Sequence, residues 1–425
     1  MPQGLTFTRA RALIVSGAYP ADPERQVNGI FQRLRLFAEA VSAESAQLEM
    51  LFFADPSVNL SPVRVGQVAA SLAAEWGIDA TVKVVPFRKL PIATSLLDYY
   101  IAPALSITRQ LPFARYLGPE QVDAVRAALA SRPDWIFTHR LQALLPCLAT
   151  GAALPPIFFD LDDVEHRFLV RSLFARKTWL GDKFRILHLP VLMHAERRAL
   201  RSAATAFVCS HRDRDYLQRL YRLDNIVVVP NPARLKPITT HMDDGRQILF
   251  VGAYGYAPNA DAAERLVTDV FPRVRASIPQ ARLVIVGEKP EAIAAYRRAP
   301  QGVTFTGFVD DLDAIYASTA LVCCPIVFGA GTRMKIVEAA GYGKAIVATR
   351  MAAEGLEFVD GREIVLKDSP AEMAAECVRL LEDRARREAL GAAARARVEI
   401  SYEREAIVAK IRLQIRTTID HHHAS

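Results

Sequence analysis

Cysteine is scarce in this sequence of 425 residues, and the spacing of its cysteines matches neither a disulfide framework nor a zinc site. The cysteines number five, and none forms a Cys-x-x-Cys pair: Cys147, Cys209, Cys323, Cys324 and Cys377. An odd number without that spacing argues against a disulfide framework and against a zinc site. Cys323 and Cys324 stand inside an apolar run, so we expect buried thiols there.

Long apolar runs are also absent. No stretch reaches the roughly 18 uncharged apolar residues that a membrane-spanning helix needs. The N-terminal "MPQGLTFTRARALIVSGAYP" lacks the apolar core of a signal peptide, because "ALIVSGAY" is too short and favours a strand. We therefore expect a soluble, cytoplasmic protein.

Motifs for nucleic acids and for common nucleotide cofactors are missing as well. The sequence contains no Walker A loop and no G-x-G-x-x-G loop, so nicotinamide cofactors are unsupported. It carries no zinc-finger, RRM or helix-turn-helix signature, so we expect no nucleic-acid partner. The net charge is nevertheless +7, and residues 167–222 hold thirteen Lys or Arg against four Asp or Glu. Such a basic face suits anionic lipid headgroups or phosphorylated substrates, or it is simply solvated.

Short β-branched or aromatic runs alternate with helical patterns along most of the chain. In the first half the expected strands are 11–19, 47–55, 80–87, 134–139, 156–163, 205–210 and 225–233, with helices at 29–43, 64–76 and up to 131. The alternation restarts after a charged, Pro- and Gly-containing stretch, with strands at 247–254, 281–288, 303–309, 320–327, 344–350 and 362–367 and helices at 259–278 and 311–318. Alternating strands and helices predict parallel sheets covered on both faces.

We therefore predict an α/β protein with two doubly wound Rossmann-like domains that face an interdomain cleft. The predicted domains are 1–233 and 247–400, joined by a linker at 234–246. Residues 401–425 are expected to form a helix that packs back on the first domain, followed by a tail with three histidines. Ligands of such sheets bind outside the carboxyl ends of the strands.

The loop "FGAGTRMKIVEAAG" follows the strand "CCPIV" and opens a helix. Gly329 and Gly331 allow a ligand to approach the backbone, and Thr332 is a suitable N-cap. Arg333 and Lys335 place two cations at the positive end of the helix dipole, which is unfavourable unless an anion binds there. The loop therefore predicts a phosphate-binding site.

Glu338 lies further along the same helix. A carboxylate at that place can accept two hydrogen bonds from a vicinal diol such as a ribose. The alternative, an ordinary helix residue on a solvated face, stays open.

The second half of the chain resembles the retaining glycosyltransferases of the two-Rossmann (GT-B) type, in the large family 4 group. The resemblance rests on "ILFVGAYGYAPNADAAERL", on "VTFTGFVDDLDAIYASTALVCCPIVFGAGTRMKIVEAAGYGKAIVATR" and on "GREIVLKDSPAEMAAECVRLLED". In the first half only "HAERRALRSAATAFVCSHRDRDYL" and "IVVVPNPA" follow the family, so the resemblance covers roughly half of the chain.

The resemblance implies a retaining hexosyltransferase that uses a nucleoside-diphosphate sugar of the UDP or GDP type and no metal or other cofactor. The donor's diphosphate would lie against the loop 329–333, with Arg333 and Lys335 as catalytic cations and Glu338 on the ribose. The remaining donor-binding positions implied by the family pattern are Gly252, Asn259, Gly307 and Phe308. Such enzymes assemble polysaccharides, glycolipids or glycoproteins.

One departure from the family pattern stands in the donor loop. The family's signature has two glutamates with seven residues between them, and the position of the first is Ala330. The sugar hydroxyls that this glutamate reads would need another partner. A non-catalytic nucleotide-sugar-binding protein, or a sugar-nucleotide epimerase of the same architecture, therefore remains an alternative.

The first half offers fewer candidates. His139 ends the strand "DWIFTH" and resembles the family histidine that contacts the donor sugar, although a structural histidine is an equal alternative. Asp162, Asp163 and His166 follow the next strand and are acceptor-side candidates, as is Gly29 at the first helix. Asp160 and Asp162 share the D-x-D spacing of metal-dependent transferases, a use that the family reaction does not need.

The segment 90–118 is rich in aromatic and aliphatic residues and is broken by prolines. We expect it to pack as helices in the core of the first domain. The alternative is an acceptor groove or, with the basic stretch 167–222, peripheral contact with the inner membrane surface at a lipid-linked acceptor.

Overall fold

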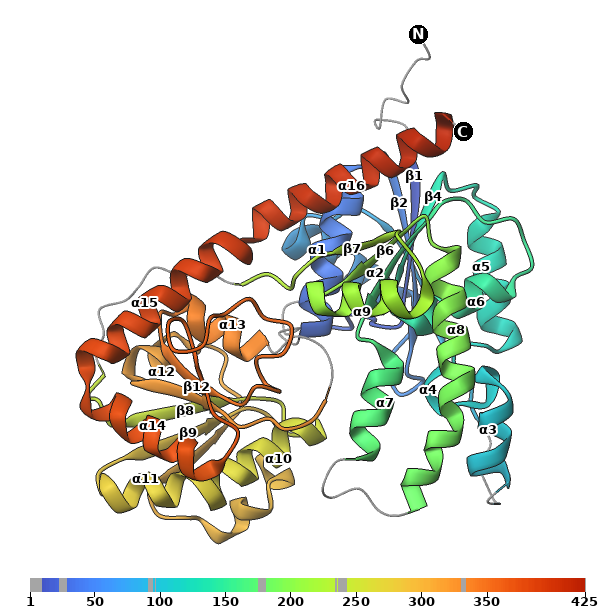
Figure 1. The fold of residues 1–425 in the computed structure, drawn as a ribbon. Helices are drawn as coiled ribbons and strands as arrows, with labels where there is room; N and C mark the ends of the chain where they lie inside the picture. Colours follow the sequence, from blue (N-terminus) through green and yellow to red (C-terminus); the bar gives the residue numbers. More distant parts are fainter. Residues whose placement is uncertain are drawn as a thin grey trace. The chain divides into compact units, whose positions relative to one another are not determined.

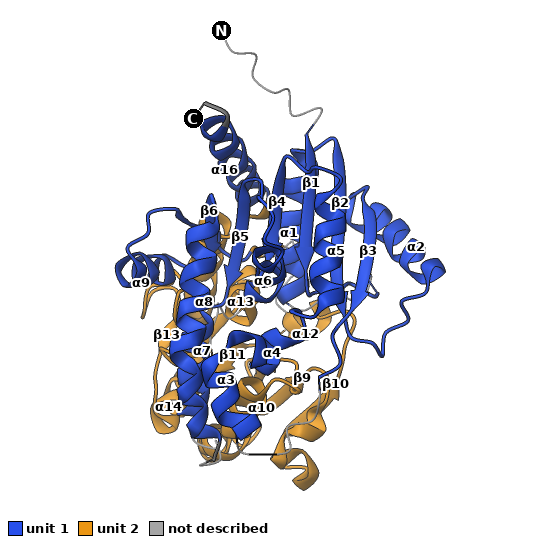
Figure 2. Cartoon of the chain, turned by 90° about the vertical axis from the view of Figure 1, so that its right-hand side faces the viewer, with its two compact units in different colours: residues 1–231, 405–425 blue, residues 232–404 orange. Residues whose placement is uncertain are grey.

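The computed structural model describes residues 10–22, 29–90, 95, 97–174, 181–233, 235, 243–329 and 334–424. The chain divides into two compact units, which Figure 2 distinguishes by colour. Unit 1 comprises residues 1–231 and 405–425, and unit 2 comprises residues 232–404. Each unit has its own parallel sheet and its own apolar core.

The sheet of unit 1 has, in the described part of the chain, seven parallel strands in the order β3-β2-β1-β4-β5-β6-β7. The central strands are buried along their whole length, as expected for a parallel sheet with helices on both faces. The strands are β1 (Arg11–Ser16), β2 (Gln47–Ala54), β3 (Thr81–Pro86), β4 (Trp135–His139), β5 (Ile157–Asp162), β6 (Thr205–Val208) and β7 (Ile226–Val228).

Helices cover both faces of this sheet (Figure 1). Alternate residues of β1 enter different cores: Ile14 packs with α1 and α2, and Leu13 packs with α5, α6 and α8. The α-helices are α1 (Gly29–Ala43), α2 (Pro62–Ser71), α3 (Ala102–Leu105), α4 (Leu111–Ala114), α5 (Pro119–Leu129), α6 (Leu141–Ala149), α7 (Glu165–Leu173), α8 (Leu189–Ser202) and α9 (His211–Tyr221). Shorter π- and 3₁₀-helical turns are Leu72–Trp76, Leu97–Ile101, Ile107–Arg109 and Gly181–His188.

The last helix, α16 (Arg404–Ala424), packs on the first half of the chain from Glu405 onward. Its apolar stripe repeats every four residues, at Ile407, Ile411, Ile415 and Ile419, and joins the core under α1. Glu44 is fully buried and binds Arg412 and Arg416 of α16 at 2.6 Å each. The stripe and these ion pairs explain why the C-terminal segment returns to unit 1.

Unit 2 is built on the order β10-β9-β8-β11-β12-β13, again parallel throughout the described residues. Its strands are β8 (Gln247–Val251), β9 (Arg282–Val286), β10 (Val303–Gly307), β11 (Leu321–Cys324), β12 (Ala345–Ala348) and β13 (Val365–Leu366). Its α-helices are α10 (Ala257–Arg265), α11 (Phe271–Ser277), α12 (Asp313–Ser318), α13 (Met334–Gly341), α14 (Pro370–Glu382) and α15 (Arg384–Ser401). A π-helical turn, Leu266–Val270, and 3₁₀ turns at Pro290–Ala292 and Ala294–Arg298 complete the unit.

Local sequence explains where several helices begin. Ser369 caps α14 by accepting a bond from the amide of Glu372, whose carboxylate in turn accepts from the Ser369 hydroxyl. Ser61 precedes Pro62 and caps α2 by accepting a bond from the amide of Arg64. These caps are readable from sequence because they need only residues three apart.

The predicted fold class, two doubly wound α/β sheets, is confirmed, and the differences are at element ends. Expected strand 11–19 ends at Ser16, and expected strand 225–233 is only Ile226–Val228. The predicted helix 259–278 begins at Ala257 and is interrupted by the π-helical turn. Residues 234 and 236–242, most of the predicted linker, lie outside the described residues.

The expectation that segment 90–118 packs into the core is only partly right. Phe113 is buried, but Leu97, Ile101, Leu105 and Leu111 expose much of their side chains. No described helix combines the length and the apolarity needed to cross a membrane.

Candidate functional site

Each sheet has one point at which the strand order reverses. In unit 1 the chain runs outward from β1 on one side and from β4 on the other, and in unit 2 the same holds for β8 and β11. The crevice outside the carboxyl ends of such a pair is where ligands bind in open α/β sheets. The two candidate sites are therefore the ends of β1 and β4 and the ends of β8 and β11.

In unit 1, three polar residues stand opposite one another at this edge. Ser16 ends β1 and pairs in register with His139 at the end of β4, which pairs with Asp160 of β5. The hydroxyl of Ser16 is 3.1 Å from His139 Nδ1, and all three side chains are buried. The sheet register alone brings these residues together, although they are far apart in sequence.

Arg33 neutralises the charge of Asp160. It lies on α1, is fully buried, and donates to the two carboxylate oxygens of Asp160 at 2.8 and 2.5 Å. Its remaining bonds reach the carbonyl of Val229 and the side chain of Asn231, both at 2.9 Å. A buried guanidinium with this many partners fixes the ends of β5 and β7 to α1.

Asp162 and Arg140 flank this pair in an unusual backbone conformation. Both have a positive φ, 58° for Asp162 and 71° for Arg140, which is rare for residues with a side chain. Arg140 Nε is 3.7 Å and Arg33 Nε is 3.5 Å from the Asp162 carboxylate. Although burial opposes it, these two cations lower the pKa of Asp162. The strand bulges between Asp160 and Asp162, so the regular alternation assumed for the D-x-D pair does not hold.

His139 is held as a neutral imidazole. Burial, together with the nearby charges of Arg140 and Arg33, lowers its pKa to about 3, although Asp162 acts in the opposite direction. Its Nε2 atom is 3.8 Å from Asp160 and makes no hydrogen bond in the described part of the protein. Depending on the tautomer, this atom can donate a hydrogen bond to a ligand hydroxyl or accept one from it. The ring carries no charge near neutral pH.

The other candidates of the first half lie in different settings. Both ring nitrogens of His166 are engaged, with Glu196 at 2.5 Å and with the hydroxyl of Tyr216 at 2.7 Å, so this histidine ties α7 to α8 and α9. Asp163 is half-buried, 3.4 Å from Arg140. Gly29 is the exposed first residue of α1.

Sequence reasoning missed four polar residues of this region: Ser16, Arg33, Arg140 and Glu165. Burial raises the pKa of Glu165 to about 7. Arg33 carried a usable signal, because it is the one cation on the apolar stripe of α1, next to Leu34 and Phe37. A charge at a core position of a helix predicts a buried partner, but not which one.

In unit 2, Asn259 connects the two loops at the reversal point. It lies near the start of α10, donates to the carbonyl of Ala253 at 3.0 Å, and accepts from Lys335 Nζ at 2.6 Å. The same ammonium lies 5.3 Å from the ring centre of Phe250, on β8. Lys335 is thus held at the beginning of α13, between the loop after β8 and the loop after β11.

Glycine allows the backbones to approach closely at this edge. A side chain at Gly287, after β9, would overlap the carbonyl oxygen of Gly252, after β8. Gly329 has a φ of 118°, a value that other residues rarely adopt, just before the start of α13. Gly307 ends β10, and Phe308, which follows it, exposes 45% of its side chain.

Glu338 lies in the middle of α13, half-buried. Two tyrosine rings stack close to it: Tyr316 of α12 and Tyr342 are parallel within 10°, with centres 4.0 Å apart. Burial, followed by the charge of Glu338, raises the pKa of Tyr316, which shows that the carboxylate is near these rings. Tyr342 donates to Asp313 at 2.5 Å. Glu338 is therefore half-buried near these two rings, and its predicted ribose contact stays a prediction.

Four residues of the predicted phosphate loop lie outside the described residues: Ala330, Gly331, Thr332 and Arg333. Their predicted roles stay predictions.

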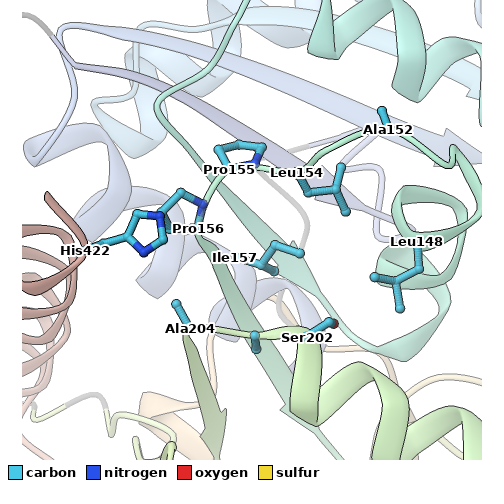
Figure 3. Close-up of a pocket in the computed structure, with 10 residues that line it drawn as sticks. Leu148, Ala152, Leu154, Pro155, Pro156, Ile157, Ser202, Ala204 and His422 are labelled. Atoms are coloured by element: carbon cyan, nitrogen blue, oxygen red, sulfur yellow. The ribbon is translucent and has the colours of Figure 1, made fainter. Parts of the chain in front are cut away.

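A metal cluster or a further pocket would be a competing site in the described part of the chain. Among them, no three His, Cys, Asp or Glu side chains cluster as metal ligands would. A shallow pocket in unit 1 is lined by Leu148, Leu154, Pro156 and His422 (Figure 3). It lies where β5 and β6 begin, the edge opposite to the candidate site.

Comparison with known proteins agrees with this geometry. Residues 245–383 match the family model described as Glycosyl transferases group 1. The resemblance to group 1 glycosyltransferases is thereby confirmed for residues 245–383, which lie within unit 2. No curated protein matches the chain.

Solved structures share the whole fold. The sucrose-phosphate synthase of Thermosynechococcus elongatus is 20% identical, with a TM-score of 0.66 over 96% of this chain and 98% of its own. Anabaena HepE in complex with UDP and glucose is 16% identical, with a TM-score of 0.63 over 97% and 99%. A TarM variant of S. aureus in complex with fondaparinux, α-GlcNAc-glycerol and UDP is 11% identical, with a TM-score of 0.64 over 96% and 99%. At this identity the likeness shows the two-domain glycosyltransferase fold.

Proposed function

We propose that the protein transfers a sugar from a nucleoside-diphosphate sugar to a glycan, lipid-linked or protein-linked acceptor, with retention of anomeric configuration and without a metal. The observation that carries this proposal is the position of Lys335. The family match, the strand-order reversal and the start of α13 coincide at this residue.

Lys335 and the helix start supply what a departing diphosphate needs. Fixed N–H groups, a helix dipole and a held ammonium stabilise developing negative charge without reorganisation. Asn259 fixes the ammonium, and Gly329 lets the backbone approach the ligand. Arg333, two residues before Lys335 in the sequence, adds a second cation to this site.

Transfer breaks the bond between the anomeric carbon and the diphosphate oxygen and forms a bond to the acceptor oxygen on the same face. The acceptor proton passes to the departing phosphate, so the reaction needs no separate protein base. The neutral imidazole of His139 accordingly acts by hydrogen bonding a sugar hydroxyl through Nε2. Glu338 receives the ribose hydroxyls.

The solved relatives support a nucleotide of the UDP type and a saccharide acceptor, since their complexes contain UDP, glucose and glycan ligands. We place the protein in polysaccharide or glycolipid assembly, at the cytoplasmic side of the membrane. We propose that no cofactor besides the donor substrate takes part.

Thermal shift with nucleotides tests the donor site directly. A ligand that binds only the folded protein raises its melting temperature by mass action. We expect UDP or GDP, alone and as sugar conjugates, to raise it, with no loss when a chelator is added. No shift with any nucleoside diphosphate would contradict the proposal, and a shift abolished by chelator would contradict its metal-free form. NMR of the product then reports the anomeric configuration.

Replacing Glu338 by alanine tests the ribose contact. We expect Glu338→Ala to weaken nucleoside-diphosphate binding by about tenfold, since hydrogen bonds to a charged group are lost. Calorimetric titration measures the affinity, and circular dichroism checks that the fold is intact. Glu382→Ala, an exposed glutamate of α14, is the control and should bind as the parent does. Equal affinity of Glu338→Ala and parent would contradict the assigned role.

A further inference from the structure

Exposed apolar side chains gather in one part of unit 1. Of the eighteen large apolar side chains that the described residues expose, eight lie on two short segments, residues 97–111 and 184–187. They are Leu97, Tyr99, Ile101, Leu105, Leu111, Phe184, Ile186 and Leu187. Scattered exposed apolar residues need no explanation, but a concentration of them marks an interaction surface. We call these eight side chains the apolar patch.

The two segments form one structure. The rings of Tyr100 and Phe184 make an edge contact with centres 5.9 Å apart. Gln110 donates to the carbonyl of His188 at 3.2 Å, and His188 Nε2 lies 3.2 Å from the carbonyl of Tyr100. Residues 97–111 are therefore joined to the 3₁₀ helix Gly181–His188 by both apolar and polar contacts, and the patch has a defined shape.

Cations are interleaved with the apolar side chains. In the helix Gly181–His188, Lys183 and Arg185 alternate with Phe184 and Ile186, and Lys183 is exposed. Arg109, exposed, stands near Leu111 in the other segment. Over residues 97–111 and 181–188, the three cations Arg109, Lys183 and Arg185 stand against the two acids Asp98 and Asp182.

The patch lies at the functional edge of the unit. α3 and α4, between which residues 105–111 run, extend beyond the carboxyl ends of the unit 1 strands in both views (Figures 1 and 2). Ser16, His139 and Asp160 stand at this same edge.

We infer that the apolar patch docks on an anionic lipid surface. Apolar side chains that enter the boundary between headgroups and acyl chains, with Lys and Arg beside them, are the combination that binds such a surface. A protein partner or a second copy of the chain is less well matched, because lysine is depleted from protein interfaces and Lys183 is exposed directly beside Phe184. This inference deepens the proposed function and rests on it in one respect: a lipid-linked acceptor would be presented at such a surface.

Vesicle sedimentation of the full chain tests the inference. The probes are vesicles of phosphatidylcholine alone and of phosphatidylcholine mixed with phosphatidylglycerol. We expect the protein to sediment with the mixed vesicles and much less with the neutral ones, and the binding to weaken as salt is added. Absence of binding to the mixed vesicles would overturn the inference.

Two variants with matched controls locate the contact. Leu105→Glu should lower the partition coefficient by about tenfold, because one buried leucine contributes that much. Ile400→Glu is its control, since Ile400 and Leu105 both expose 78% of their side chains and Ile400 lies in unit 2. Lys183→Glu should weaken binding by roughly tenfold or more at low salt, with Lys410→Glu on α16 as the control. Equal losses in variant and control would overturn the assignment of the patch.

The remaining outcomes are separable. If the parent protein dimerises in sedimentation velocity, Leu105→Glu abolishes the dimer and no vesicles are bound, the patch is an interface between copies and the inference is wrong. Nucleotide binding is measured on the same variants without vesicles. Loss of vesicle binding with intact nucleotide binding leaves the proposed function standing, and failure of nucleotide binding with intact vesicle binding affects only that function.

Discussion

The two units place a site at the same point of the same kind of sheet, but they build it in opposite ways. In unit 1 the edge is filled by buried side chains that bond one another: Arg33 with Asp160, and Ser16 with His139. In unit 2 the described part of the corresponding edge is formed by backbone at Gly252, Gly287 and Gly329, with the ammonium of Lys335 held beside it.

Under the proposed function, the difference corresponds to the ligand of each edge. A diphosphate is recognised by backbone N–H groups and a helix start, which require glycine and few side chains. A sugar or acceptor hydroxyl is recognised by positioned neutral polar atoms, which a buried network holds in place. Replacing one side chain of the buried network in unit 1 should therefore lower stability, and replacing a side chain of the edge in unit 2 should lower ligand affinity.

Arg33→Met should produce the largest effect. The change leaves Asp160 as a buried charge without its partner, so we expect a loss of about 3–5 kcal/mol in the free energy of unfolding. All three tryptophans, at 76, 135 and 179, belong to unit 1, so fluorescence during urea denaturation reports this unit.

The matched control is Arg219→Met, an exposed arginine of α9 in the same unit, which donates to the carbonyl of Asp215. It should change stability by no more than about 0.5 kcal/mol. The double variant Arg33→Met with Asp160→Leu should recover part of the loss, since neither partner is then left unpaired. A single variant Arg33→Met as stable as the parent would show that the network does not hold the sheet edge.

His139 should make the stability of unit 1 depend on pH. Its pKa is about 3 in the folded protein and about 6.5 when unfolded, so the unfolded chain takes up the proton first as the pH falls. The stability due to neutral His139 is complete above about pH 6.5 and is lost below it, by about 2 kcal/mol at pH 5.

His139→Gln should lack this loss. Glu165 acts in the opposite direction, because its raised pKa of about 7 makes the folded protein the stronger proton acceptor between its usual range and neutral pH. Subtracting the free energy of unfolding of the variant from that of the parent at each pH removes the contribution of Glu165. Parallel stability curves for the two proteins would show that His139 is not kept neutral by burial.

In unit 2, substitutions at the candidate site should change the affinity for a nucleoside diphosphate. Lys335→Met should weaken nucleoside-diphosphate binding by about tenfold, and Asn259→Ala by roughly threefold, because Asn259 acts by holding the ammonium. In the Lys335→Met background, Asn259→Ala should then have little further effect. Lys367→Met, which follows the edge strand β13, is the control. Additive losses for the pair would mean that Asn259 contacts the nucleotide independently.

Much of the architecture could be predicted because it depends on local patterns. The strand 134–139 and the helix 29–43 follow from runs of apolar residues and from the 3.6-residue period, and both are observed within one residue. The π-helical turn Leu266–Val270 was missed, because the periodicity of the helix 259–278 continues through it.

The site was only partly predictable. Gly329, Lys335 and Glu338 share one loop and one helix, so their association was visible in sequence order. The donor-binding role of Asn259 stays a prediction, and its bonds to Lys335 and Ala253, which hold the lysine in place, became visible only in the structure. Ser16 bonds His139 of β4, and Arg33 of α1 bonds Asp160 of β5. In each case the two residues are over a hundred positions apart, so no local pattern could reveal the pair.

Two parallel α/β sheets and a glycine-containing loop before a helix could be predicted from the sequence, because hydrophobic periodicity, helix caps and glycine spacing depend on residues a few positions apart. The side-by-side position of Ser16, His139 and Asp160, the neutralisation of Asp160 by Arg33, and the exposure of apolar side chains on segment 97–111 became visible only in three dimensions. Register between strands and the packing of helices on a sheet are set by the whole core at once, and no short stretch of sequence contains that information.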